Sequence, residues 1–182
     1  MKARVNVGMG DVKITDDPSA TLTALGLGSC VGVVLYDPTR RIAAMLHVVL
    51  PHSRAQSRDD KRFRFADQAI PEAIEKLCAE GANRRRLKAA IAGGAAMFSF
   101  GTASHINIGD DNIRAVREQL RLAHIPILGD DTGGNVSRTL IFDLETAEAR
   151  VKQAGGQEEL LANLAAPAVL TSQARPPLAK AA

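Results

Sequence analysis

The chain has 182 residues, of which 46% are hydrophobic, 24% charged and 3% aromatic, and its formal net charge is +3. This length suits one domain whose core is packed mainly by Val, Ile, Leu and Ala. No apolar run approaches the roughly 18 residues of a membrane helix, and the polar start at residues 1–4 lacks a signal-peptide core. Two cysteines are too few for a disulfide framework, so we expect a cytoplasmic protein.

Apolar patterning predicts strands with two helices between them. A helix near 65–80 carries apolar residues at helical spacing, contains Pro71, which could kink or delay it, and stops at Gly81. A second helix is predicted over 111–123, with Asp110 and Asp111 capping its start. Strands are predicted at 5–9, 12–14, 21–25, around Cys30, around His47, and at 87–92, 125–128, 139–142 and 147–151. Mixed strands with intervening helices predict an α+β fold.

The strands around Cys30 and His47 are predicted to form a hairpin. Residues 37–40, Asp-Pro-Thr-Arg, are typical of a turn. A four-residue loop would pair Tyr36 with Arg41 and set Cys30 directly opposite His47. Opposed residues have β-carbons roughly 4.5–5.5 Å apart, so a thiol and an imidazole could exchange a proton. A slip of one residue would turn one of them to the other face.

This pair has the chemistry of an acyl-transfer site. An imidazole can take the proton of a thiol and leave a nucleophilic thiolate. Glycines at 26, 28 and 32 allow close approach of a substrate and let backbone N–H groups, such as that of Cys30, face an oxyanion. The alternative is a buried thiol beside a core histidine. The glycine spacing does not fit a dinucleotide loop.

Other motifs predict no cofactor and no metal. The run at 130–135, Asp-Asp-Thr-Gly-Gly-Asn, has the composition of a tight turn and lacks a calcium-loop ligand series. The histidines at 47, 52, 105 and 124 show no metal-ligand spacing. Basic residues such as those at 84–86 have almost no aromatic neighbours, which argues against nucleic acid. Cys78 is predicted to be a packed thiol on the inner side of the first helix.

Five ordered motifs resemble the CheD family of chemoreceptor glutamine deamidases, over about residues 5–152. They are Leu-Gly-Leu-Gly-Ser-Cys-Val at 25–31; His47 with Leu-Pro at 50–51; Ile-Ala-Gly-Gly-Ala-Ala-Met-Phe at 91–98; Asn-Ile-Gly at 107–109; and Asp-Thr-Gly-Gly-Asn at 131–135 with Arg138. The resemblance implies a layered α/β/β sandwich, a single domain of mixed or antiparallel sheets with helices on one side.

The resemblance also implies an activity and partners. The family hydrolyses side-chain amides of glutamines in the helical cytoplasmic region of chemoreceptors, releasing ammonia through a cysteine thioester. Carried over by position, Cys30 is the nucleophile and His47 the general base and acid, with Gly28 and Ser29 as oxyanion or substrate-loop candidates. A CheC-type phosphatase is an implied partner. The basic residues would, if anything, attract an acidic receptor helix bundle.

Two positions depart from the family pattern. A threonine, proposed as the third catalytic residue, usually precedes the glycine motif, and here Ala24 stands in its place. Thr23 is adjacent but should face the other way unless a bulge intervenes. Either a backbone carbonyl near Ala24 orients His47, which we favour, or the imidazole is poorly held and turnover is slow. Asp111 replaces a usual arginine and could alter docking.

The chain is predicted to divide at about residue 152. Residues 1–152 form the deamidase-like domain, and residues 153–182 form a mobile Ala- and Pro-containing tail, with a short helix around 157–164 and no catalytic role.

Two classes of function remain open for this chain. The first class is an active protein-glutamine amidohydrolase. The second is a weakly active or inactive adaptor that binds chemoreceptors or the phosphatase. A general thiol protease is a distant third.

Overall fold

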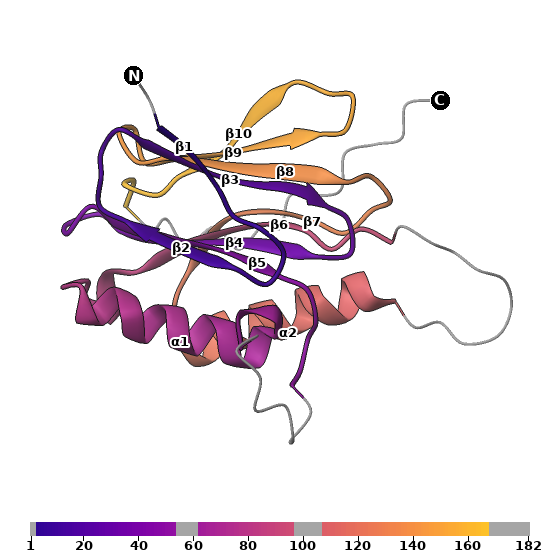
Figure 1. The fold of residues 1–182 in the computed structure, drawn as a ribbon, viewed down its shortest axis with the longest axis horizontal. Coiled ribbons are helices and arrows are strands. Elements are labelled where there is room, and N and C mark those ends of the chain that lie inside the picture. The colour runs from indigo at the N-terminus through magenta and orange to yellow at the C-terminus, as the bar shows by residue number, and fades with distance from the viewer. Residues whose placement is uncertain (1–2, 54–61, 97–106, 168–182) are drawn as a thin grey trace, which may run out of the picture.

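The computed structural model describes residues 3–53, 62–96 and 107–167, which form two five-stranded sheets and two α-helices (Figure 1). The first sheet has the order β1 (Ala3–Asn6), β3 (Ala20–Leu27), β8 (Arg138–Asp143), β9 (Glu148–Gln153), β10 (Glu158–Asn163). The second has the order β2 (Val12–Thr15), β5 (Ile42–Val48), β4 (Val31–Asp37), β6 (Lys88–Gly93), β7 (Ile127–Thr132). The helices are α1 (Ala66–Ala79) and α2 (Ile108–Leu122), with short 3₁₀ turns η1 (Arg62–Arg64) and η2 (Arg84–Arg86).

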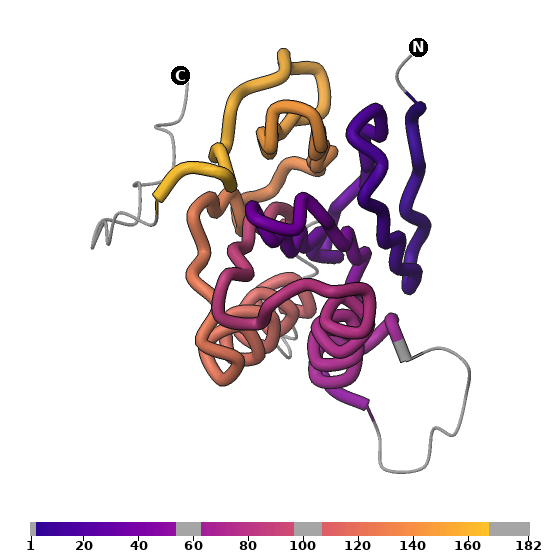
Figure 2. Tube along the Cα trace, turned by 90° about the vertical axis from the view of Figure 1, so that its left-hand side faces the viewer, coloured from indigo at the N-terminus to yellow at the C-terminus, as the bar shows by residue number. Residues whose placement is uncertain are grey.

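The elements stack in three layers, helices, second sheet and first sheet (Figure 2). Every residue of β4 and β5 is buried, because the second sheet is covered on both faces. Alternation divides β4 between the layers: Val33 and Leu35 contact the helices, whereas Val34 and Tyr36 contact the first sheet. The predicted α/β/β sandwich with helices on one side is therefore confirmed.

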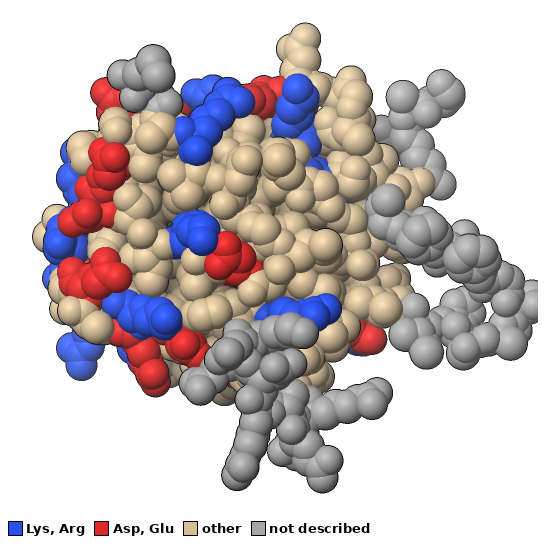
Figure 3. All heavy atoms as spheres, viewed as in Figure 1, with Lys and Arg blue, Asp and Glu red and all other residues tan. Residues whose placement is uncertain are grey.

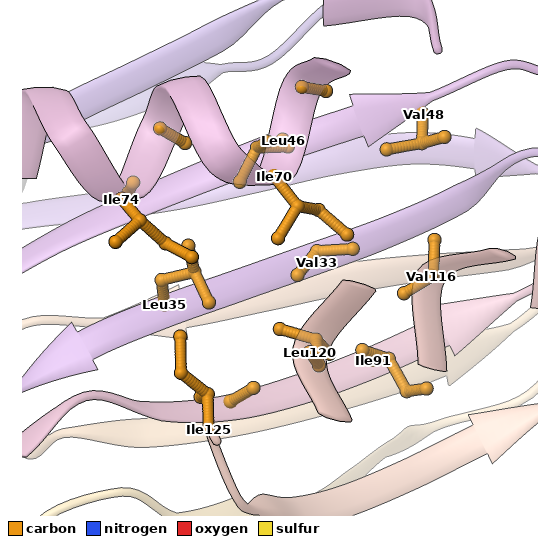
Figure 4. Packing of buried hydrophobic residues seen from close by; sticks show 14 of the residues in the cluster. Val33, Leu35, Leu46, Val48, Ile70, Ile74, Ile91, Val116, Leu120 and Ile125 are labelled. Carbon is orange, nitrogen blue, oxygen red and sulfur yellow. The ribbon is translucent and has the colours of Figure 1, made fainter. Parts of the chain in front are cut away.

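The helix-side core joins α1 and α2 to the second sheet (Figure 4). The buried positions of α1 recur at helical spacing and include Ile70, Ile74 and Leu77. In Figure 4, Ile70 and Ile74 point toward strand residues such as Leu35 and Leu46. Pro71 lies within α1, which still begins at Ala66, so the helix does not start late. Cys78 packs against this core, as predicted.

Helix α2 begins three residues before the predicted start. Its N-cap is Asn107, whose side chain accepts a hydrogen bond from the Asp110 N–H at 3.3 Å. Asp110 and Asp111 lie in the first turn, where carboxylates favour the helix dipole, and do not provide the cap. Asp111 is ion-paired with Arg114 on the exposed side of the helix.

The predicted short helix around residues 157–164 is wrong. Residues 158–163 form β10, which pairs antiparallel with β9, rather than a short helix. Leu164 follows the strand and is fully buried in the core between the sheets. Packing of Leu161 and Ala162 close to Gly129 of β7 leaves no room there for a larger side chain, so β10 is fixed against the second sheet. Residues 168–182 lie outside the described part of the chain.

No helix within the described residues is long and apolar enough to cross a membrane. The core between the two sheets is mainly aliphatic, and among the described residues it holds the aromatic pair Tyr36 and Phe142, whose ring centroids are 5.2 Å apart. Both Cys30 and the strand segment containing His47 border this core.

Candidate functional site

The β4–β5 hairpin forms, but in a register different from the predicted one. Asp37 pairs with Ile42 and Gly32 pairs with His47. The turn comprises residues 38–41, because Arg41 adopts a left-handed φ of 54° and donates its N–H to the Asp37 carbonyl at 2.8 Å. Cys30 is therefore not directly opposite His47 but precedes the strand by one residue.

The difference in register is two residues, so it preserves the face that each side chain occupies. His47 follows Ala43 and Met45 along β5, and both of these pack in the core between the sheets. Cys30 belongs to the same core and is 9% exposed, while His47 is 2% exposed. The thiol, one residue before β4, and the imidazole of β5 thus lie on one face, at the end of the sheet where β4 begins.

The imidazole of His47 is held by a main-chain carbonyl. Its Nδ1 lies 3.3 Å from the carbonyl oxygen of Val7, at the end of β1. Val7 in turn donates its N–H to the carbonyl of Thr23 at 2.8 Å, so the contact comes from the strand beside the one that carries Ala24. The carbonyl that contacts the ring is therefore Val7's, and not one near Ala24 in sequence.

The other ring nitrogen, Nε2, has no hydrogen-bond partner among the described residues. With Nδ1 donating to Val7, Nε2 is the unprotonated nitrogen, which is the form that accepts a proton. Nε2 is fully buried and has no hydrogen-bond partner in the described part of the chain, which includes Cys30. A buried nitrogen that can accept a proton is thus left available at this end of the sheet.

Burial sets the charge state of both groups. Burial lowers the pKa of His47, and the contact with Val7 opposes that shift only in part. Burial likewise raises the pKa of the Cys30 thiol, against the opposing effects of its own N–H and of the positive charge of Arg64. Both shifts favour the uncharged forms of the two groups, the thiol and the neutral imidazole.

Ala24 and Thr23 face opposite sides of β3. Ala24 is fully buried in the core between the sheets, and its partner across the ladder is Leu140. The irregularity in β3 falls after Ala24, around Gly26, so it does not turn Thr23 inward. No side-chain hydroxyl forms a hydrogen bond with His47 among residues 3–53, 62–96 and 107–167.

The glycine loop before Cys30 is clamped to the end of β6. The Gly28 carbonyl accepts from the Ala95 N–H, and the Cys30 carbonyl accepts from the Gly94 N–H, each at 2.7 Å. A β-carbon on Gly93 would lie 2.3 Å from the Cys30 carbonyl oxygen, so only glycine fits there. These contacts fix the backbone of residues 28–30 against the end of β6.

The two oxyanion candidates differ in availability. The N–H of Gly28 already donates to the Gly26 carbonyl at 2.9 Å. The N–H of Ser29 has no acceptor within the described segments. Of the two predicted loop residues, Ser29 alone retains a backbone donor for a substrate.

Sequence reasoning missed the part played by Asn112. Its Nδ2 donates to the carbonyl of Ser29 at 2.8 Å and to that of Val49 at 2.9 Å. Helix α2 thus links the residue before Cys30 to the residue two after His47. Asn112 is fully buried, and its Oδ1 has no partner in the described part of the chain. The available signal was an asparagine beside the apolar positions Ile113 and Val116.

The carboxylates of the predicted turn at 130–135 pair with arginines. Asp131 lies 3.1 Å from the Nε of Arg138, and Asp130 lies 2.8 Å from a terminal nitrogen of Arg117. Gly133 and Gly134 have positive φ angles, in agreement with a tight turn. No cluster of three or more His, Cys, Asp or Glu suited to a metal occurs among the described residues, and His105 lies outside them.

The two-sheet sandwich covered by helices on one side is a single-domain α+β fold, and it carries a buried thiol and a buried imidazole at one end of the second sheet. Residues 49–153 match the family model described as CheD chemotactic sensory transduction. This chain belongs to the CheD family.

Named relatives cover most of the chain. A "Probable chemoreceptor glutamine deamidase CheD" of Caldanaerobacter subterraneus is 46% identical over 83% of this chain and 93% of its own length. The proteins of the same name from Lachnoclostridium phytofermentans and Clostridium botulinum are 42% and 41% identical, over 85% and 86% of this chain and 96% and 97% of their own lengths.

Proposed function

We propose that this protein is a protein-glutamine deamidase that converts glutamine side chains of chemoreceptors to glutamate in chemotaxis signalling. The observation that carries the proposal is the placement of Cys30, just before β4, and His47 of β5 on one face, with a buried Nε2 that has no partner among the described residues. The names of relatives that are 41–46% identical supply the substrate class.

The proposed chemistry has two halves. In the first, Nε2 of His47 takes the thiol proton, Cys30 attacks the side-chain amide carbon, and the C–N bond breaks as ammonia leaves with that proton. In the second, His47 takes a proton from water, the hydroxide attacks the thioester, and the C–S bond breaks to restore the thiol. The net reaction adds one water and releases one ammonia.

Two features support this sequence of steps. The neutral imidazole favoured by burial is the form that can accept the thiol proton, and the Val7 carbonyl keeps Nε2 unprotonated. The unpaired N–H of Ser29 adjoins Cys30 and would donate to the oxyanion that forms in each half. No residue here needs a metal or another cofactor for the reaction.

A purified chemoreceptor cytoplasmic fragment incubated with this protein tests the proposal. Mass spectrometry would detect the mass increase of roughly one dalton that each conversion of Gln to Glu produces in the receptor fragment. Cys30→Ala should abolish it, whereas Cys78→Ala is the matched control, since Cys78 lies on α1 on the opposite side of the second sheet. Conversion by Cys30→Ala, or none by the wild type, would contradict the proposal.

A second candidate function is a chemotaxis adaptor with little catalytic rate, which binds chemoreceptors or a CheC-type phosphatase. Its support is that Ala24 supplies no hydroxyl and that burial disfavours both charged partners of the dyad. Ala24→Thr in the same assay separates the two. A large gain in rate would favour the adaptor, and an unchanged rate would favour an enzyme whose histidine is held by the Val7 carbonyl.

We further propose that the deamidase unit extends through β10, because Leu164 is part of the core between the sheets. The protein would act in the cytoplasm, on the helical cytoplasmic region of the receptor, without nucleic acid. Because Leu164 is buried, truncation after residue 152 should lower the free energy of unfolding. A truncated protein as stable as the full chain would place the domain boundary at residue 152 instead.

A further inference from the structure

Exposed apolar side chains gather at the end of the molecule that holds the dyad. Among the described residues, the large hydrophobic side chains that are exposed are Met9, Leu25, Ile108, Leu122, Val136 and Leu160. Leu122 is the last residue of α2, and Leu160 lies within β10. The other four lie in segments that contact the dyad or the loops beside it.

Met9 and Leu25 belong to the segments that border the dyad from the first sheet. Met9 lies in the turn after β1, and the next residue, Gly10, donates its N–H to the His47 carbonyl at 2.8 Å. Leu25 lies near the end of β3 and precedes Gly26, whose carbonyl accepts an N–H at 2.9 Å from the loop that leads to the thiol. Both side chains are therefore exposed within a few residues of the site.

Ile108 belongs to the segment that borders the dyad from the helix layer. It is the first residue of α2 and precedes Gly109. A β-carbon on Gly109 would lie 2.5 Å from the carbonyl oxygen of Gly94, so the start of the helix packs directly on that residue. Gly94 in turn donates its N–H to the Cys30 carbonyl at 2.7 Å. The start of α2 is thus fixed beside the thiol loop.

Val136 belongs to the connection between β7 and β8. Two residues earlier, the Gly134 carbonyl accepts the N–H of Ala96 at 2.8 Å, just after the end of β6. The neighbouring Ala95 donates its N–H to the loop before Cys30. Four separate segments, each joined to the dyad or to its loops, thus carry one exposed apolar side chain each. We call Met9, Leu25, Ile108 and Val136 the apolar rim.

The charge around the apolar rim is low. Few Lys, Arg, Asp and Glu lie on the right of the face drawn in Figure 3, where β3 ends and β4 begins. Two carboxylates at this end, Asp11 and Asp131, are paired with Lys13 and Arg138. A partner that placed a charge on this surface would lose the solvation of that charge without gaining an ion pair. The rim therefore fits uncharged, apolar side chains of a partner.

The strands around the dyad favour a helical partner over an extended one. An extended peptide binds by adding to a free strand edge. However, β4 lies between β5 and β6, and β3 lies between β1 and β8, so neither strand beside the thiol has a free edge. A helix satisfies its own backbone hydrogen bonds and presents residues three and four apart on one face. It can therefore place one side chain on the thiol and apolar neighbours on the rim.

We propose that the apolar rim selects glutamines that lie on a helix with apolar side chains one turn before and one turn after them. This inference rests on the proposed function, because the rim serves the reaction only if Cys30 acts on glutamine. Docking on the rim is measurable without any turnover. The rim and the proposed function can therefore fail separately.

The test is binding of two labelled peptides to the full chain carrying Cys30→Ala, measured by fluorescence anisotropy. Each peptide is an Ala-rich helix of about 20 residues with one central glutamine. One has leucine three and four residues to either side of the glutamine, and the other has glutamate at those positions. The leucine peptide should bind at least about tenfold more tightly, because the glutamates would lose solvation on the rim. Equal affinities, a preference for glutamate or no binding of either peptide would overturn the proposal.

Variants of the rim locate the docking surface. Leu25→Glu and Met9→Glu should each weaken binding of the leucine peptide about tenfold. Leu160→Glu is the matched control, because Leu160 is 56% exposed on a strand away from the rim and Leu25 is 55% exposed. Met9 is 75% exposed in a turn, so Met9→Glu decides the matter if Leu25→Glu does not fold.

Unchanged affinity in the rim variants, or an equal loss in Leu160→Glu, would overturn the role of the rim. Conversion of the receptor fragment by the wild type together with equal binding of the two peptides would refute the rim alone. Binding of the leucine peptide through the rim without any conversion of the receptor fragment would refute the proposed function and support the rim.

Discussion

The two ends of β4 differ in how completely their polar groups are satisfied. At the Asp37 end, the buried carboxylate accepts hydrogen bonds from the N–H groups of Thr39, Arg40 and Asn83 and is paired with Arg86 at 2.8 Å. At the Cys30 end, Nε2 of His47 and Oδ1 of Asn112 are buried without partners in the described part of the chain.

This difference separates a structural end of the strand from the end where we propose that the reaction takes place. Fully satisfied polar groups stabilise and define a turn, whereas buried groups without partners cost free energy and persist at sites that need them for another purpose. The surface charge also differs between the two ends. On the face shown in Figure 3, Lys, Arg, Asp and Glu gather mainly on the left, and few of them lie on the right, where β3 ends and β4 begins. The following changes test the contrast.

Removing the buried carboxylate of Asp37 should have the largest effect on the free energy of unfolding. Asp37→Ala leaves Arg86 and several backbone N–H groups without their acceptor, and we expect the free energy of unfolding to fall by about 4 kcal/mol. Urea denaturation measures it. Cys30→Ala, at the other end of the strand, should change stability by less than about 1 kcal/mol. Equal losses in the two variants would contradict the contrast.

Asn112→Ala should have the next largest effect, and it should act on both stability and the site. The change leaves the carbonyls of Ser29 and Val49 unpaired in a buried position, which should cost about 3 kcal/mol in unfolding free energy. It also frees the loop before Cys30, so kcat should fall more than KM changes. Asp111→Ala, on the adjacent exposed position, is the control, and a kcat equal to that of the wild type in Asn112→Ala would exclude a positioning role.

Acid should destabilise the protein through Asp37. Burial alone would raise the pKa of this carboxyl, but Arg86 and three backbone N–H groups outweigh burial and lower the pKa from 3.8 to about 2. The unfolded chain therefore takes up the proton first, so the stabilisation of about 2 kcal/mol is present above about pH 4 and is lost as pH falls toward 2. Asp37→Asn should lack this acid limb in urea titrations, and an identical limb in both proteins would refute the assignment.

His47 should produce a smaller effect in a separate pH window. Its folded pKa lies below 6.5, so the unfolded chain binds the proton first and stability declines as pH falls below that value. Thermal unfolding at about pH 7.5 and about pH 5.5 should show a loss that His47→Asn reduces. NMR titration of the imidazole checks the direction, and a midpoint above 6.5 would contradict it.

Local patterns allowed most elements of the second sheet and both helices to be predicted. Apolar runs and turn residues gave the strands around Cys30 and His47, and helical spacing of alanine and isoleucine gave α1. The strand β10 was not found, because Glu158, Glu159 and Leu160 at a sheet edge lack the alternation of a half-buried strand.

The sequence by itself determined that a cysteine and a histidine lie on one face of a hairpin, since alternation survives a register shift of two residues. Only the tertiary structure decided which residues pair across the hairpin. Arg41 adopts a left-handed φ, so the turn comprises residues 38–41 rather than 37–40, and Asp37 pairs with Ile42. It also decided that Val7 holds the imidazole and that Asn112 joins the loop before Cys30 to the segment after His47. These contacts join segments far apart in the chain, and no local pattern of residues encodes which backbone or side chain will arrive there.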